Sequence, residues 1–187
     1  MQVRDCVAFA AETLDLKNVV RYLKSGETDE YSNVSDTLDT LLSAYNAVAD
    51  EIARDFIKLT RSEVFTVTGK ELRFSKFSDN PLKIMSVKGA DDKAAAAKIY
   101  PDKLVAEEGE ITIESVFAPA ARSLNDECDF TYTEIGARTL GLGVAAEYAL
   151  ISGMYEQAVI YNEKFIDAMK NALFKRKKPK IKGRAWF

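Results

Sequence analysis

The last thirteen residues, KRKKPKIKGRAWF (175–187), carry the side chains with the most evident binding chemistry. Seven of them are basic, none is acidic, and the chain ends on Trp186 and Phe187. Ammonium and guanidinium groups pair with phosphates and carboxylates, and aromatic side chains stack on bases or fill apolar pockets. We call this segment the basic tail and expect it to contact a partner. Its candidate contact residues are Lys175, Arg176, Lys177, Lys178, Lys180, Ile181, Lys182, Arg184, Trp186 and Phe187.

Three roles are open to the basic tail. It could be a solvated end that aids solubility. It could be a nucleic-acid arm, whose cations contact phosphates and whose aromatic rings stack on bases. It could also be a docking peptide, in which Ile181, Trp186 and Phe187 fill pockets on a partner protein while the cations give steering and register.

The charge of the rest of the chain favours the docking peptide. Without the seven basic residues of the tail, residues 1–174 hold 19 basic and 29 acidic side chains, a formal charge of −10. That charge repels phosphate, and no nucleic-acid-binding fold is evident in those residues. Pro179 and Gly183 discourage a helix, so the tail is expected to bind in extended form.

The chain offers few residues for catalysis or metal binding. It contains no histidine, the commonest general base and a common zinc ligand. The acidic pairs at 91–92 and 107–108 lie beside turn signals, where a solvated surface is the ordinary interpretation. The GLG sequence at 141–143 lacks the Lys-Ser/Thr of a phosphate-binding loop. No catalytic residue, metal site or cofactor is predicted, and the protein is not expected to be an enzyme.

The two cysteines are too few for a disulfide framework. Cys6 lies in an apolar helical stretch and is expected to be a buried thiol. Cys128 lies between Glu127 and Asp129, whose negative charges disfavour a reactive thiolate.

Length and composition indicate one globular domain, or one domain with an appendage. The 187 residues are 47% hydrophobic and 29% charged, which is an ordinary balance. No apolar run approaches the roughly 20 residues that span a bilayer, so no membrane association is expected. The N-terminus carries charge where a signal peptide has its apolar stretch, which predicts a protein made and folded inside the cell.

Apolar residues spaced three and four positions apart predict helices over residues 3–25 and 35–57. Ser35 or Asp36 is the expected N-cap of the second helix. The apolar stripe of that helix consists of Leu38, Leu41, Leu42, Tyr45, Val48, Ala49, Ile52 and Phe56.

Residues 62–118 are expected to form a small antiparallel β module inserted between helices. Strands at 63–67 and 71–75 flank the turn Thr68-Gly69-Lys70 and are predicted to pair as a hairpin. Further strands are expected near 82–87, 98–101, 103–105 and 110–117. In the last of these, Ile111 and Ile113 are predicted to face inward.

A helical hairpin is predicted over residues 134–152 and 154–174, with Thr133 as the N-cap. Its first helix is rich in glycine and alanine, which lets another backbone come close, either within the subunit or from a neighbour. The predicted fold class is therefore α+β, mainly α. N-terminal helices and a C-terminal helical hairpin flank the β module in a single domain, residues 1–174, followed by an extended basic C-terminal tail, residues 175–187.

Several loose motifs are spread over nearly the whole chain. They are VRDCVAFAA at 3–11, NAVADEIARDF at 46–56, FSDNP at 77–81, GVAAEY at 143–148, GMYEQA at 153–158 and the GRAWF end at 183–187. Together they resemble the head–tail connector (adaptor) proteins of tailed bacteriophages. The predicted β module is larger than the short hairpin of the smaller, nearly all-helical adaptors.

The resemblance implies a structural virion protein in the neck of the phage, assembled in the host cytoplasm. Such adaptors form a ring, expected to hold about twelve copies, beneath the portal, and they continue the channel through which the DNA is ejected. The implied partners are the portal protein, neighbouring copies, downstream tail or neck proteins, and genomic DNA that passes without specific binding.

The resemblance also assigns a role to the basic tail, because the C-terminal segments of adaptors reach up to the portal. Residues 175–187 would then be a portal-docking arm. The negative charge of residues 1–174 would keep DNA from adhering to the channel wall. The alternative function is a nucleic-acid-binding accessory protein that uses its basic aromatic tail, and its binding would weaken steeply with salt.

Overall fold

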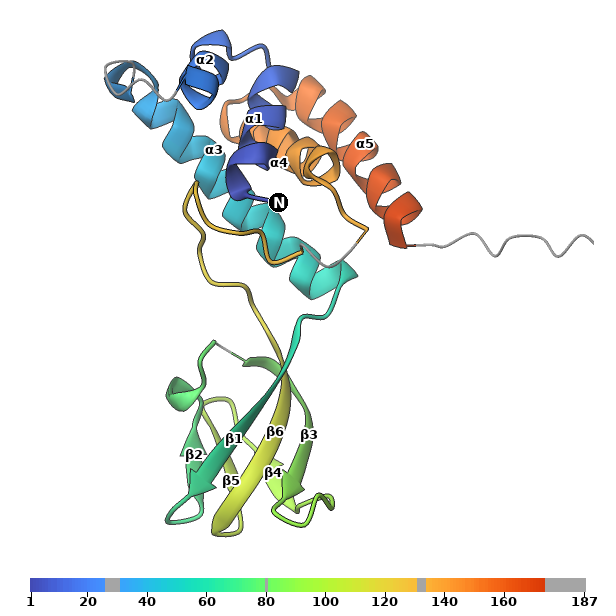
Figure 1. Cartoon of the computed structure of the whole chain (residues 1–187). Helices are drawn as coiled ribbons and strands as arrows, with labels where there is room; N and C mark the ends of the chain where they lie inside the picture. Colours follow the sequence, from blue (N-terminus) through green and yellow to red (C-terminus); the bar gives the residue numbers. More distant parts are fainter. Residues whose placement is uncertain (26–30, 80, 131–133, 174–187) are drawn as a thin grey trace, which may run out of the picture.

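The computed structural model describes residues 1–25, 31–79, 81–130 and 134–173. Figure 1 shows a helical bundle at one end of the molecule and a β module at the other. The fold class is α+β and mainly α, as the sequence predicted. Two segments distant in sequence build the bundle, and the β module is inserted between them.

Within the described residues, five α-helices form the bundle. Asp15, with a left-handed φ of 56°, separates the first two. The third helix continues directly into a π-helical turn at Ile52–Phe56. The helices are α1 (Val3–Thr13), α2 (Lys17–Ser25), α3 (Tyr31–Glu51), α4 (Ala137–Ile151) and α5 (Tyr155–Leu173).

The predicted stripe of α3 lies at the centre of the bundle core. Six of its eight residues are buried, and Leu42 and Phe56 pack against the core from its edge. The core also takes Val3, Cys6 and Val7 from α1, and Phe165 and Met169 from α5. Burial of these apolar side chains at the predicted helical spacing explains why the helices assemble.

Two helix starts differ from the prediction. The helix expected from residue 35 begins at Tyr31, because Val34 is already buried against the core. Ser35 and Asp36 therefore lie inside its first turns and do not cap it. The helix expected from 134 begins at Ala137, with Gly136 in the N-cap position. The predicted cap Thr133 lies outside the described residues.

The glycines of α4 bring it close to other elements of its own subunit. A Cβ on Gly141 would lie 2.9 Å from the backbone oxygen of Cys6 and 2.7 Å from the ring of Phe9. A Cβ on Gly143 would lie 2.8 Å from Val48 and 3.1 Å from Phe165. The small residues therefore serve helix packing inside the bundle.

Two three-stranded antiparallel sheets form the β module, with strand orders β1-β6-β3 and β2-β5-β4. Their inward side chains make a second core that includes Val67, Leu72, Leu104, Ile111 and Ile113. The inward orientation predicted for Ile111 and Ile113 is confirmed. The strands are β1 (Thr60–Val67), β2 (Glu71–Arg73), β3 (Pro81–Gly89), β4 (Ala97–Ile99), β5 (Lys103–Ala106) and β6 (Gly109–Phe117).

The predicted hairpin of residues 63–67 and 71–75 is wrong. Strand β1 pairs with β6 over its whole length, and β2 pairs with β5 in the other sheet. Pairing with β5 places Leu72 opposite Leu104, and both are fully buried. Burial in the second core thus outweighs the local turn signal at Gly69.

In the part of the chain that the structure describes, the bundle and the β module have separate cores that share no residue. The chain leaves the bundle through β1 and returns through β6, and these two strands lie side by side in Figure 1. Thr60 is paired with Val116 where the strands meet the bundle. The paired strands β1 and β6 therefore join the two modules.

Candidate functional site

The binding residues predicted in the basic tail, 175–187, all lie outside the described residues. The described part of the chain ends at Leu173, the last residue of α5. The candidate site must therefore be sought on the surfaces of the bundle and the β module.

A groove of about 240 Å³ runs along the bundle between α3 and α5, with α4 as its floor. Its centre is apolar, with the small side chains of Ala146 from α4 and Ala158 from α5, and Val48 and Phe165 close over Gly143 at its base. We call it the α3–α5 groove. Its lining residues are Val48 and Glu51 from α3, Gly143, Ala146, Glu147 and Leu150 from α4, and Ala158, Val159, Asn162 and Phe165 from α5.

Two carboxylates, Glu51 and Glu147, give the groove a negative rim, and none of the described residues that line it is basic. Partial burial raises the pKa of Glu51, and the nearby charges of Asp55 and Glu147 raise it further. Like charges that raise a carboxyl pKa are stabilised when a cation approaches. The groove therefore favours a ligand that combines an apolar group with positive charge.

Exposed apolar side chains surround one end of this groove, where α4 turns into α5. They lie between residues 150 and 160, on either side of Gly153, whose φ of +75° makes the tight turn. We call this surface the α4–α5 patch. It consists of Leu150, Ile151, Tyr155, Val159 and Ile160, each at least half exposed.

A second exposed apolar surface lies on the β module. Met85 and Ile99 border a hollow between β3 and β4, and Tyr100 follows Ile99 in the chain. Val64 is exposed on β1, in the same sheet as β3. The molecule thus exposes apolar side chains on both modules.

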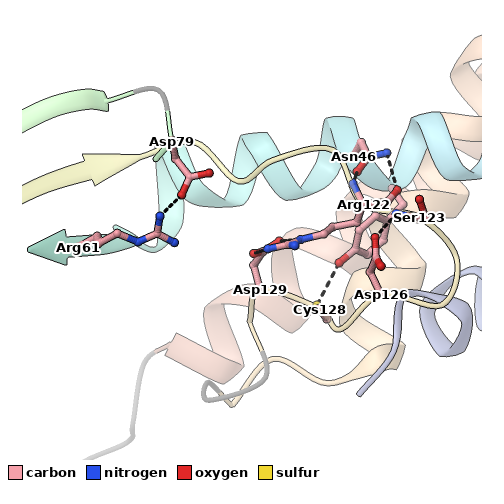
Figure 2. A network of polar contacts seen from close by, with 9 residues as sticks. Asn46, Arg61, Asp79, Arg122, Ser123, Asp126, Cys128 and Asp129 are labelled. Carbon is pink, nitrogen blue, oxygen red and sulfur yellow. Dashed lines mark hydrogen bonds and ion pairs between the residues drawn. The ribbon is translucent and has the colours of Figure 1, made fainter. Parts of the chain in front are cut away.

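A polar network fixes the connection that returns from the β module to the bundle (Figure 2). The Asn46 amide of α3 donates to the Arg122 carbonyl at 3.2 Å and accepts from the Arg122 N–H at 2.8 Å. The Arg122 guanidinium in turn pairs with both oxygens of Asp129. Backbone bonds from Val3 and Arg4 to Asp126 and Leu124 add a second attachment, at the start of α1.

A second ion pair lies within the β module, near where it joins the bundle. Arg61 of β1 pairs with Asp79, as Figure 2 shows. Its guanidinium also lies 4.6 Å from the centre of the Phe117 ring on β6. Arg61 therefore links both connecting strands to the segment before β3 through charge and cation–π contacts.

Cys6, Tyr45 and Cys128 form a buried polar cluster between α1, α3 and the return connection. The Tyr45 hydroxyl donates to the Cys128 sulfur at 3.1 Å. Hydrogen bonds from Cys6 and Tyr45 lower the pKa of Cys128 to about 6, against the opposing effects of burial and Asp129. The charge of Asp129 disfavours this thiolate, as predicted, but the hydrogen-bond donors that the fold brings to the sulfur outweigh it. Cys6 is buried, as predicted.

Within residues 1–25, 31–79, 81–130 and 134–173, no three His, Cys, Asp or Glu side chains gather as metal ligands would. In that same part of the chain, every helix is too short or too polar to cross a membrane. The α3–α5 groove and the α4–α5 patch therefore remain the best-defined candidate binding surfaces. Searches found no protein-family model and no curated protein that matches the chain.

The sequence pointed to only part of this site. Glu51 and Glu147 lie 96 positions apart, and nothing in the spacing indicated that they border one groove. Asn46 lies outside the predicted apolar stripe of its helix, and nothing in the sequence indicated that it binds the return connection. A detectable signal was the run of small residues at 141–146, which indicated close packing.

Proposed function

We propose that the protein is a ring-forming head–tail connector, a structural virion protein that joins a phage portal to the tail and continues the DNA channel. The observation that carries the proposal is the exposure of apolar side chains on both modules, together with a basic aromatic tail. Cyclic assembly is head-to-tail and needs two different surfaces on each subunit. The α4–α5 patch and the β-module surface supply a candidate pair.

The distribution of charge fits the same role. Residues 60–118 carry 9 basic and 10 acidic side chains, a charge of −1, whereas residues 1–59 and 119–174 carry 10 and 19, a charge of −9. A ring whose bundles line the channel would repel DNA and let it slide. In this proposal the protein is not an enzyme, its partners are the portal, neighbouring copies and a downstream tail protein, and its place is the neck of the virion.

The basic tail is the proposed portal-docking arm. Trp186 and Phe187 would enter apolar pockets of the portal, and the seven cations would steer the approach. Aromatic anchoring resists salt, whereas contacts with phosphate weaken steeply as salt rises. The salt dependence of binding therefore separates this proposal from the nucleic-acid alternative.

Native mass spectrometry of the protein mixed with the portal from the same genome tests the proposal. We expect about one copy to add per portal subunit, and the W186A/F187A variant to lose this binding. A matched control, K177A/K178A, removes charge and keeps both anchors, so it should retain most of the binding at moderate salt. Absence of portal binding by the wild-type chain, or tight DNA binding that is lost in the K177A/K178A variant, would contradict the connector proposal.

A further inference from the structure

The α3–α5 groove has the features of a peptide site whose ligand carries both apolar and positive groups. Its apolar lining includes Ala146 from α4 and Val159 from α5, and Val159 is 59% exposed. Glu51 and Glu147 face the opening without a basic neighbour among the lining residues. Apolar burial would supply the affinity, and the two carboxylates would orient flanking cations.

The chain itself contains a segment with this chemistry. Residues 175–187 combine seven cations with Ile181, Trp186 and Phe187. The segment also starts near the groove, since Phe165 and Val159 lie 8 and 14 residues before Leu173 on α5. At the rise of an α-helix, these separations are roughly 12 and 21 Å.

The length of the segment matches that distance. Trp186 is 13 residues beyond Leu173, and a flexible chain of this length has a root-mean-square span of about 20 Å. When the span of a linker matches the distance between two sites, the effective concentration is highest and reaches about the millimolar range. Even a weak peptide site on α5 would therefore be occupied within one chain.

We propose that residues 175–187 fold back into the α3–α5 groove of the same chain. Trp186 and Phe187 contact the apolar lining at Ala146 and Val159, and the neighbouring cations face Glu51 and Glu147. The groove competes with any external partner of the tail, so the free protein holds its binding segment until that partner displaces it. This contact depends on the groove alone and stands whether or not the partner is a portal.

The fluorescence of the full-length protein tests this contact, because Trp186 is its only tryptophan. We expect an emission maximum shifted to the blue of a synthetic 175–187 peptide, and several-fold weaker quenching by acrylamide. V159R places a charge on the groove wall and should return both signals to those of the peptide. The paired substitution E51Q/E147Q should move them part of the way.

Matched controls separate the groove from general effects. V64R changes a valine of the β module that is 63% exposed, close to the 59% of Val159. This substitution should leave the emission and quenching of Trp186 unchanged. E156Q neutralises a carboxylate of α5 that does not line the groove, and should also leave the emission of Trp186 unchanged. Circular dichroism verifies that V159R keeps its helices, which is expected because Val159 is on the surface.

Dilution distinguishes the same chain from a second copy. Emission that stays constant over a hundredfold dilution is expected for a contact within one chain, and a return to the peptide signal on dilution would overturn it. Wild-type emission identical to that of the peptide, or V159R emission identical to wild type, would also overturn the proposal. No portal is present in these measurements, so a failure here is distinct from a failure of the connector proposal.

Discussion

At the residue scale, the contact of Tyr45 with Cys128 makes a pH-dependent element of the bundle core. Donors from Tyr45 and Cys6 lower the pKa of Cys128 to about 6. The hydrogen bond with Cys128 raises the pKa of Cys6, as does burial. Burial, followed by the same kind of hydrogen bond, raises the pKa of Tyr45. Cys128 therefore ionises at a lower pH in the folded protein than in the unfolded chain, whereas Cys6 and Tyr45 ionise at a higher pH.

The directions of these pKa shifts define a pH range in which the folded state is most stable. Between about pH 6 and 8.5, folded Cys128 has released a proton that the unfolded chain retains, so the free energy of unfolding rises with pH. This contribution is lost as pH falls through 6. Above about pH 9 the unfolded chain ionises Cys6 and Tyr45, which stay protonated when folded, and stability falls again.

Urea denaturation at a series of pH values measures this pH dependence of stability. No histidine titrates in the same range, because the chain has none. C128S should abolish the rise between pH 6 and 8.5. Y45F removes one donor but keeps the thiol, and should reduce the rise. An unchanged pH profile in C128S would assign the dependence to other groups.

Residue identity predicted little of this cluster from sequence. Cys6 and Cys128 are 122 positions apart, and the local neighbours of Cys128 pointed to the wrong sign of its pKa shift. The same holds for Asn46, whose two bonds to Arg122 are set by tertiary structure. Helical spacing identifies which face is polar, but it does not identify what that face binds.

At the scale of elements, α4 depends on glycine for its position rather than for its conformation. Replacing Gly141 by alanine improves helix propensity by about 1 kcal/mol. The new methyl group would, however, overlap the Cys6 carbonyl of α1 and the Phe9 ring. We expect a net destabilisation of up to about 2 kcal/mol, because overpacking costs about 1–3 kcal/mol.

Chemical denaturation of G141A measures this net effect. G136A is the control, because a Cβ at that position meets nothing within 4 Å. Its cost should be confined to the N-cap preference, about 1 kcal/mol or less. A G141A variant more stable than wild type would show that α1 moves aside freely and that the close approach is not required.

Elements were predicted well where one periodic stripe determines them. The α3 stripe and the inward residues of β6 follow from spacing alone, because each buries one face. Strand pairing was not predictable in the same way, since β1 and β2 adjoin in sequence but belong to different sheets. The turn at Gly69 favoured a local hairpin, but burial in the core of the β module stabilises the observed pairing of β2 with β5.

At the scale of the whole molecule, the two separate cores imply two regions that open separately. L104A removes a fully buried side chain from the β core, at a cost of about 2–5 kcal/mol. Hydrogen exchange should then accelerate in residues 60–117 and change little in α1 and α4 while the β module stays folded. Equal acceleration throughout the chain would show a single cooperative unit.

The paired strands at the junction also bear on the order of folding. The bundle needs residues 1–59 to meet residues 119–173, and the chain between them would otherwise form one long loop. Once β1 and β6 pair, Thr60 and Val116 are already adjacent, and the loop is reduced to a few residues. That reduction lowers the entropic cost of closing the loop by about 2 kcal/mol. During synthesis, residues 60–117 emerge before α4 and α5, so the inserted module can fold first and bring the two halves of the bundle into register.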